Sequence, residues 1–247
     1  MLIVGIDAAT KPNKVGVVWG DWSPATGLAI EEADLLSRLG TAALSARLAG
    51  AAHGALVAVD APLGWPLALG RGLHSHQAGA PLAADADHLF SRACDRMIWK
   101  TLRKRPMEVG ANLIARTAAA ALGLVQALRE ATRLPLPMGW SPGQLPTQPE
   151  VLEVYPAATR LVHGLPKRDT EAELALLRES GVSMSREAAA VAVASDHVLD
   201  AMFCCLAAMD YLEGGVFRPG DAALGEECSP PIAAKEGWIW VRRPAAT

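Results

Sequence analysis

The sequence lacks several features that would assign a class directly. Its four cysteines, Cys94, Cys204, Cys205 and Cys228, have none of the paired spacings of a zinc site. No stretch approaches 18 uninterrupted apolar residues, and the N-terminus has no basic region of a signal peptide. We therefore expect buried free thiols, no membrane span and no membrane partner, and a cytoplasmic location.

Aromatic residues are also scarce, at 5% of the chain, and the seven tryptophans are scattered. This spacing is unlike the clustered aromatic residues that stack single-stranded bases. The hydrophobic share of 51% and charged share of 20% exclude a largely disordered chain. A chain of 247 residues can form one sizeable core with a large insertion, but not two full-sized α/β lobes. The sequence indicates no oligomeric state.

Two apolar segments each end in an aspartate. Residues 1–10 read MLIVGIDAAT and residues 55–62 read ALVAVDAP, a pattern typical of buried strands. A helix predicted over residues 41–52 would connect them in a right-handed crossover and make them a parallel pair. We therefore expect Asp7 and Asp60 at the same edge of adjacent strands.

A late helix, predicted over residues 195–212, carries further acids. Asp196 and Asp200 lie one turn apart, and His197 precedes Asp200 by three residues. Small residues along this helix indicate close packing on the sheet, which would bring its first turns to the strand ends. Alternatively, Ser195 and Asp196 only cap the helix, which explains Asp196 better than Asp200.

Carboxylates that converge repel one another unless a cation neutralises them. The economical explanation of such a cluster is a divalent metal, and oxygen ligands favour Mg²⁺ or Mn²⁺ over zinc. For any single aspartate, capping a turn or a helix is the structural alternative.

The middle of the chain differs in charge from its flanks. Residues 67–148 contain ten Lys and Arg against five Asp and Glu, whereas the whole chain has a net charge of -3. We predict a largely helical insertion here, with helices over 87–102 and 111–132, placed over the strand ends as a lid or substrate platform. Its charge suits a polyanion, or is simply a solvated basic face. Glu153, on a fifth strand over 151–155, either joins the site or pairs with a base of the insertion.

The predicted order of elements is β-β-β-α-β-α-β-α, with strands also over 15–22 and 28–36. With acids on the first and fourth strands and a late acidic helix, this order resembles the RNase H-like fold. It is most similar to the Holliday-junction-resolvase branch, whose (Asp/His)-x-x-Asp-Ala pattern appears here from His197 to Ala201. The chain also resembles the predicted nucleases of domain of unknown function 429. The matching pieces are Gly5–Ala8, Val59–Pro66, Arg92–Arg96, Glu153–Ala157, Ser195–Ala201 and Glu236–Ile239.

The resemblance implies a single α/β domain over residues 1–247, with a mixed five-stranded sheet flanked by helices. Its core would be 1–66 and 149–247, with the insertion 67–148 between the fourth and fifth strands. It also implies cleavage of DNA or RNA, branched forms included, by one or two Mg²⁺ or Mn²⁺ ions, with two expected. One ion would activate water and the other would stabilise the leaving oxygen. The implied catalytic residues are Asp7, Asp60, Asp200 and His197, and the implied metal ligands are Asp7, Asp60, Asp196 and Asp200, with Glu153 as a possible addition.

Arg92 and Arg96 lie four residues apart on a predicted helix and could bind substrate phosphates. Alternatively, Arg92 and Asp95 form salt bridges that dock the insertion. A second function class is a non-catalytic module of the same fold that binds nucleic acid or protein. A third is an actin-like phosphotransferase, which residues 7–10 (DAAT) resemble, although the chain lacks a second lobe and a glycine-rich adenosine-binding loop.

Overall fold

The computed structural model describes residues 1–110 and 114–244, which form an α/β structure around a mixed sheet. The sheet has six strands in the order β5-β4-β1-β2-β3-β6. Their bounds are β1 Leu2–Asp7, β2 Gly16–Ser23, β3 Gly27–Leu35, β4 Ala55–Asp60, β5 Glu150–Glu153 and β6 Val182–Ser183. The predicted count of five was wrong by one, because the two-residue β6, parallel to β3, is too short to leave a pattern in the sequence.

The helices of the described residues lie between and after these strands. They are α1 Leu36–Leu39, α2 Thr41–Ala49, α3 Leu67–His74, α4 Ala86–Phe90, α5 Ala93–Leu102, α6 Ile114–Thr132, α7 Pro156–Val162, α8 Thr170–Glu179, α9 Arg186–Ala194, α10 Asp196–Glu213 and α11 Pro230–Glu236. The helix predicted over 87–102 is two helices, because Ser91 and Arg92 adopt extended backbone between α4 and α5. The predicted start of the 111–132 helix, at 111–113, lies outside the described residues.

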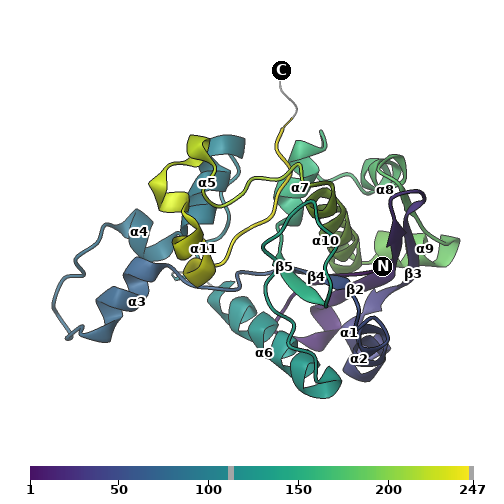
Figure 1. The fold of residues 1–247 in the computed structure, drawn as a ribbon, viewed down its shortest axis with the longest axis horizontal. Coiled ribbons are helices and arrows are strands. Elements are labelled where there is room, and N and C mark those ends of the chain that lie inside the picture. The colour runs from purple at the N-terminus through teal and green to yellow at the C-terminus, as the bar shows by residue number, and fades with distance from the viewer. Residues whose placement is uncertain (111–113, 245–247) are drawn as a thin grey trace.

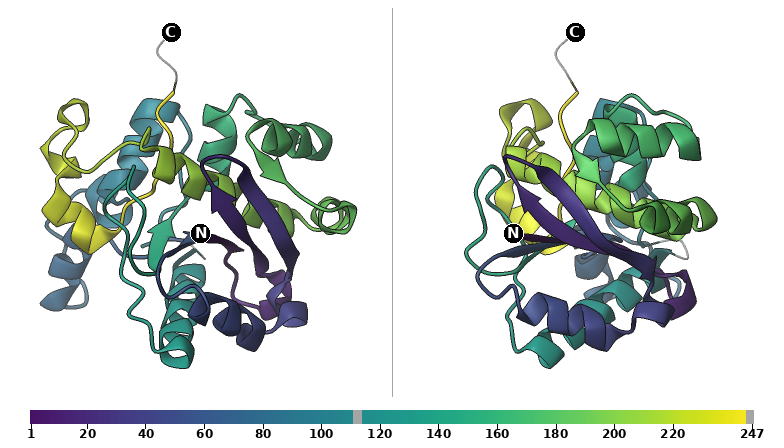
Figure 2. Two further views of the ribbon diagram at one scale, coloured as in Figure 1. Left: turned by 45° about the vertical axis from the view of Figure 1, so that its right-hand side comes forward. Right: turned by 90° about the vertical axis from the view of Figure 1, so that its right-hand side faces the viewer.

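Helices cover both faces of the sheet, as the right-hand view of Figure 2 shows. Alternate residues of β1 face opposite sides. Leu2, Val4 and Ile6 pack with α2 and α6, whereas Ile3 belongs to the core that contains α10. Since α6 lies within residues 67–148, part of the predicted insertion is a layer of the core and not a lid.

The remaining helices of that segment gather beside the β5 edge of the sheet. There α3, α4 and α5 lie next to α11, which comes from the other end of the chain (Figure 1). The segment 67–148 is therefore held from two sides, by the sheet through α6 and by the C-terminal region through α11.

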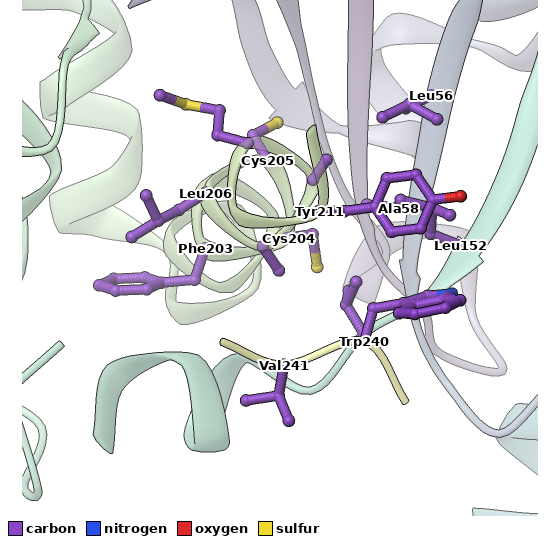
Figure 3. Packing of buried hydrophobic residues seen from close by; sticks show 14 of the residues in the cluster. Leu56, Ala58, Leu152, Phe203, Cys204, Cys205, Leu206, Tyr211, Trp240 and Val241 are labelled. Carbon is purple, nitrogen blue, oxygen red and sulfur yellow. The ribbon is translucent and has the colours of Figure 1, made fainter. Parts of the chain in front are cut away.

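The helix α10 is the central element of one core. Its Cys204 and Cys205 are fully buried among strand residues such as Ala58, and all four cysteines are free, as expected (Figure 3). Tyr211 at its far end meets Trp240 edge to face, with ring centroids 4.9 Å apart. Among the described helices, none alone is long and apolar enough to cross a membrane. The helices α9 and α10 meet that criterion only when they are taken together, and the pair is bent by 119°.

Candidate active site

The first two predicted site residues lie side by side at the carboxyl ends of β1 and β4. Asp7 pairs in register with Asp60 on the adjacent parallel strand. Both follow the alternation of Ile3, Leu56 and Ala58, so both face the α10 side of the sheet. The crossover predicted from the sequence therefore brings the two carboxylates together as expected.

Two glycines allow α10 to reach this edge of the sheet. A Cβ on Gly5 would overlap the carbonyl oxygen of Ala201, and a Cβ on Gly16 would overlap that of His197. Only glycine leaves room for the helix backbone to lie this close to β1 and β2. As a result, His197 Nδ1 lies 2.6 Å from Asp7 Oδ2 and hydrogen-bonds it.

Burial and mutual repulsion act on both strand-end carboxylates. Burial, followed by the charge of Asp200, raises the pKa of Asp7 to about 8, although Arg168 and Arg160 oppose the shift. Burial, followed by the charges of Asp7 and Asp200, raises the pKa of Asp60 well above its usual range. Three carboxylates thus interact across the strand ends, and burial and repulsion disfavour the ionised forms of Asp7 and Asp60 unless a cation lies nearby.

The third carboxylate, Asp200, is held by two arginines. Arg168 donates two hydrogen bonds of 3.1 Å to its oxygens, and Arg160 forms a second ion pair with it. Arg160 is buried, pairs with Glu173 at 3.0 Å and lies over the ring of Phe203. Sequence reasoning missed both arginines, and the only available indication was that they follow β5, the strand next to Asp60.

Asp196, the remaining predicted metal ligand, lies apart from this group. Its side chain is 78% exposed and reaches Arg168 only at 3.8 Å. Ser195 caps the helix by accepting a hydrogen bond from the backbone of Val198. Asp196 therefore sits in the first turn of α10, where a negative charge is favourable, as the structural alternative expected.

Glu153 takes the second of its two predicted roles, because it pairs with a base of the insertion. Arg92 is 1% exposed and contacts Glu153 at 2.7 Å and Asp95 at 2.8 Å. Arg92 also donates to the backbone carbonyl of Glu236, whose carboxylate accepts from the backbone of Ala93. This buried network joins β5, α5 and α11.

The two arginines predicted to bind substrate are therefore engaged within the protein. Arg92 forms the docking salt bridges of the alternative reading. Arg96 donates hydrogen bonds of 2.9 and 3.0 Å to Glu227 and a further one to the backbone of Ser91. Arg168, which is half-exposed beside Asp200, is better placed to meet an anion at the strand ends.

A cavity of about 230 Å³ opens beside the two strand-end carboxylates. Asp7 and Asp60 line one part of it, and Arg92 and Glu153 line another. Apolar side chains such as Tyr155 form most of the remaining wall. The site thus combines a pair of acids with a small and mainly apolar recess.

A comparison with models of known protein families identifies the family of this chain. The model described as "Protein of unknown function (DUF429)" matches residues 5–223. The chain belongs to this family. The DUF429 match begins within β1 and ends after α10, so it includes Asp7, Asp60 and Asp200. Searches of curated proteins and of solved structures gave no match.

The fit of this DUF429 site to a metal ion depends on the carboxylate pair. Within residues 1–110 and 114–244, no three His, Cys, Asp or Glu side chains are grouped so as to hold a metal. Mg²⁺, however, is usually bound through one or two carboxylates and completes its shell with water and substrate phosphate. Asp7 and Asp60 provide such a pair of oxygen ligands. A cation bound beside them would favour the ionised forms of both carboxylates.

Proposed function

We propose that this DUF429 protein is a divalent-metal-dependent hydrolase of phosphodiester bonds in nucleic acid, with an RNase H-like fold. The observation that carries the proposal is the in-register pair of desolvated carboxylates, Asp7 and Asp60. Two neighbouring acids on a sheet edge, both made costly to ionise by burial and by nearby carboxylates, favour the binding of a cation. The meander β1-β2-β3, extended by parallel β4 and β5, supports the fold assignment.

In this proposal Asp7 and Asp60 hold one Mg²⁺ or Mn²⁺ ion. The bound ion supplies Lewis-acid activation of water and neutralises charge on the phosphodiester. The two ions expected from the sequence would also need Asp200 and Asp196 as ligands. Because Asp200 is held by Arg160 and Arg168 and Asp196 is exposed, the proposal is limited to one ion on the protein's own ligands.

The other residues orient the carboxylates and receive the substrate. His197 hydrogen-bonds one oxygen of Asp7 and leaves the other oxygen available. Arg160 fixes Asp200 from within the core. Arg168 keeps part of its guanidinium in solvent beside Asp200, so its positive charge could meet a phosphate group at the strand ends.

The proposal is tested on labelled single-stranded, duplex and branched DNA and RNA with Mg²⁺ or Mn²⁺. We expect cleavage by the wild type and a loss of at least about 100-fold in Asp7→Asn, since even indirect partners of a metal contribute 10–100-fold. The matched control is Asp21→Asn, which makes the same change at an exposed residue paired with Leu2, at the opposite end of β1.

Equal activity in the wild type and in Asp7→Asn would overturn the proposal and reveal a contaminating nuclease. Salt-sensitive binding of nucleic acid with no cleavage by any variant would instead support the binding-module function. Transfer of phosphate from ATP to a small acceptor, without cleavage, would support the phosphotransferase function.

A further inference from the structure

The cavity beside Asp7 and Asp60 has no role in the chemistry proposed so far. Its lining comes from segments that are distant from one another in the sequence. These segments are the ends of β1 and β4, the loop after α5, the start of α6 and the residues after β5. The side chains that converge there include Met107 from the loop, Thr117 from α6 and Tyr155 after β5. A recess assembled from so many segments is a feature of the fold and not of one loop.

The walls of the cavity suit an uncharged group better than a phosphate. Its apolar lining includes Pro106, Ile114 and Ile239, and its acids are Asp7, Asp60 and Glu153. Among the described residues of the lining, the only base is Arg92, which is already paired with Glu153 and Asp95. With the metal and the phosphodiester at the carboxylates, the rest of the cavity offers a further phosphate no unpaired base among the described lining residues, whereas an uncharged ring can pack against its apolar walls.

Two side chains of the lining, Tyr155 and Met107, can contact a flat ring. Burial, with a smaller effect of Asp60, raises the pKa of Tyr155 to about 12, so its phenol is neutral and can donate a hydrogen bond. Met107 lines the cavity yet is 56% exposed, which places an adaptable apolar side chain at the mouth. Aromatic and thioether groups both pack well against flat π-systems.

The size of the cavity limits the occupant. Its volume of about 230 Å³ is below the ~300–1,000 Å³ typical of sites for drug-sized ligands. One heterocycle fits this space, but a base pair or a stacked dinucleotide does not. A base in the cavity must therefore be unstacked from its neighbours.

We infer that the cavity binds one unstacked nucleobase of the nucleotide whose phosphodiester lies at Asp7 and Asp60. This inference rests on the proposed function and names its substrate class, single-stranded or frayed nucleic acid. The apolar recess holds the base, and the carboxylate edge next to it receives the adjoining phosphodiester.

The test compares two chromogenic phosphodiesters, one with a base and one without. These are the p-nitrophenyl ester of thymidine 5′-monophosphate and bis(p-nitrophenyl) phosphate, assayed with Mn²⁺. The variant Thr117→Phe places a ring in the cavity, and the matched control Ala119→Phe places the same ring on the exposed side of α6. A second variant, Met107→Ala, removes the side chain at the mouth, and thermal unfolding checks that each variant is folded.

For the thymidine ester, we expect KM to rise about tenfold or more in Thr117→Phe, because stacking contributes ~1–3 kcal/mol per base. Met107→Ala should raise the same KM by a smaller factor. The change should be smaller for bis(p-nitrophenyl) phosphate, which lacks a base, and Ala119→Phe, on the exposed side of α6, should match the wild type with both esters. An equal change for both esters in Thr117→Phe, or no change for either, would overturn the inference.

A binding experiment separates failure of this inference from failure of the proposed function. Isothermal titration with adenosine and thymidine 5′-monophosphates, in the presence of Mg²⁺, measures base binding without hydrolysis. Nucleotide binding that is lost in Thr117→Phe but kept in Ala119→Phe would support the base-binding cavity even if no ester were cleaved. Cleavage of both esters together with no nucleotide binding would support the proposed hydrolase function and overturn the inference of a base-binding cavity.

Discussion

Replacing Asp7 with asparagine should stabilise the folded protein at neutral and alkaline pH in the absence of metal. The pKa of Asp7 is about 8 in the folded protein, against an ordinary value of 3.8. Below about pH 3.8 the carboxyl is protonated in both the folded and the unfolded state. Between pH 3.8 and 8 the unfolded chain loses this proton and the folded protein keeps it, so stability falls as pH rises through that window.

The structure sets the size of this effect. A gap of about four pH units corresponds to at most ~6 kcal/mol at 1.36 kcal/mol per unit. The side chain is 12% exposed and its titration is coupled to that of Asp60, both of which reduce the gain. We therefore expect Asp7→Asn to raise the free energy of unfolding by about 1–3 kcal/mol at pH 8.

The assay is urea unfolding at several pH values from 4 to 9 in the presence of a chelator. The wild type should lose stability toward pH 8, and Asp7→Asn should have a shallower pH dependence, with the remainder coming from Asp60. Asp21→Asn, at the other end of β1, should follow the wild type. A pH dependence in Asp7→Asn as steep as that of the wild type would refute the reasoning about a desolvated carboxylate pair.

Three further predictions concern packing, the buried network and the substrate. Gly5→Ala should destabilise the protein by about 1–3 kcal/mol in urea unfolding, because its methyl group meets the backbone of α10. The control Gly123→Ala on α6, where a Cβ meets nothing within 4 Å, should stabilise the protein by about 0.5–1 kcal/mol. Arg92→Met should lower the free energy of unfolding by about 3–5 kcal/mol in the same assay, since two buried carboxylates lose their partner. Arg96→Met breaks a more exposed pair and should lower it by about 1 kcal/mol or less. Arg168→Gln should weaken nucleic-acid binding and reduce its salt dependence, measured by fluorescence anisotropy at several salt concentrations, and an unchanged salt dependence would remove Arg168 from the substrate contacts.

The strand ends could be predicted from the sequence because local patterns determine them. An apolar run that ends in an aspartate, repeated after a helix of crossover length, is enough to pair Asp7 with Asp60. The small residues of α10 likewise indicated that His197 would come close to β1. In each case the information lies within one segment or in the connection between two.

The partners of Asp200 could not be predicted in this way. Arg160 lies on α7 and Arg168 lies in the loop after it, so their distance from Asp200 depends on how α7 and α10 pack together. The position of α6 posed the same difficulty. The sequence predicted a helix there, but it did not determine whether that helix would cover the sheet or the active site.

The most direct test of the central claim is the rate of oligonucleotide cleavage, measured against Mn²⁺ concentration, for the wild type and for Asp60→Asn. Asp60 contributes only its carboxylate to the proposed site, and asparagine keeps the shape of the side chain while removing its charge. The account predicts a saturable dependence on Mn²⁺ in the wild type and a loss of at least about 100-fold in the variant. Cleavage by Asp60→Asn at the wild-type rate, with the same dependence on Mn²⁺, would contradict it.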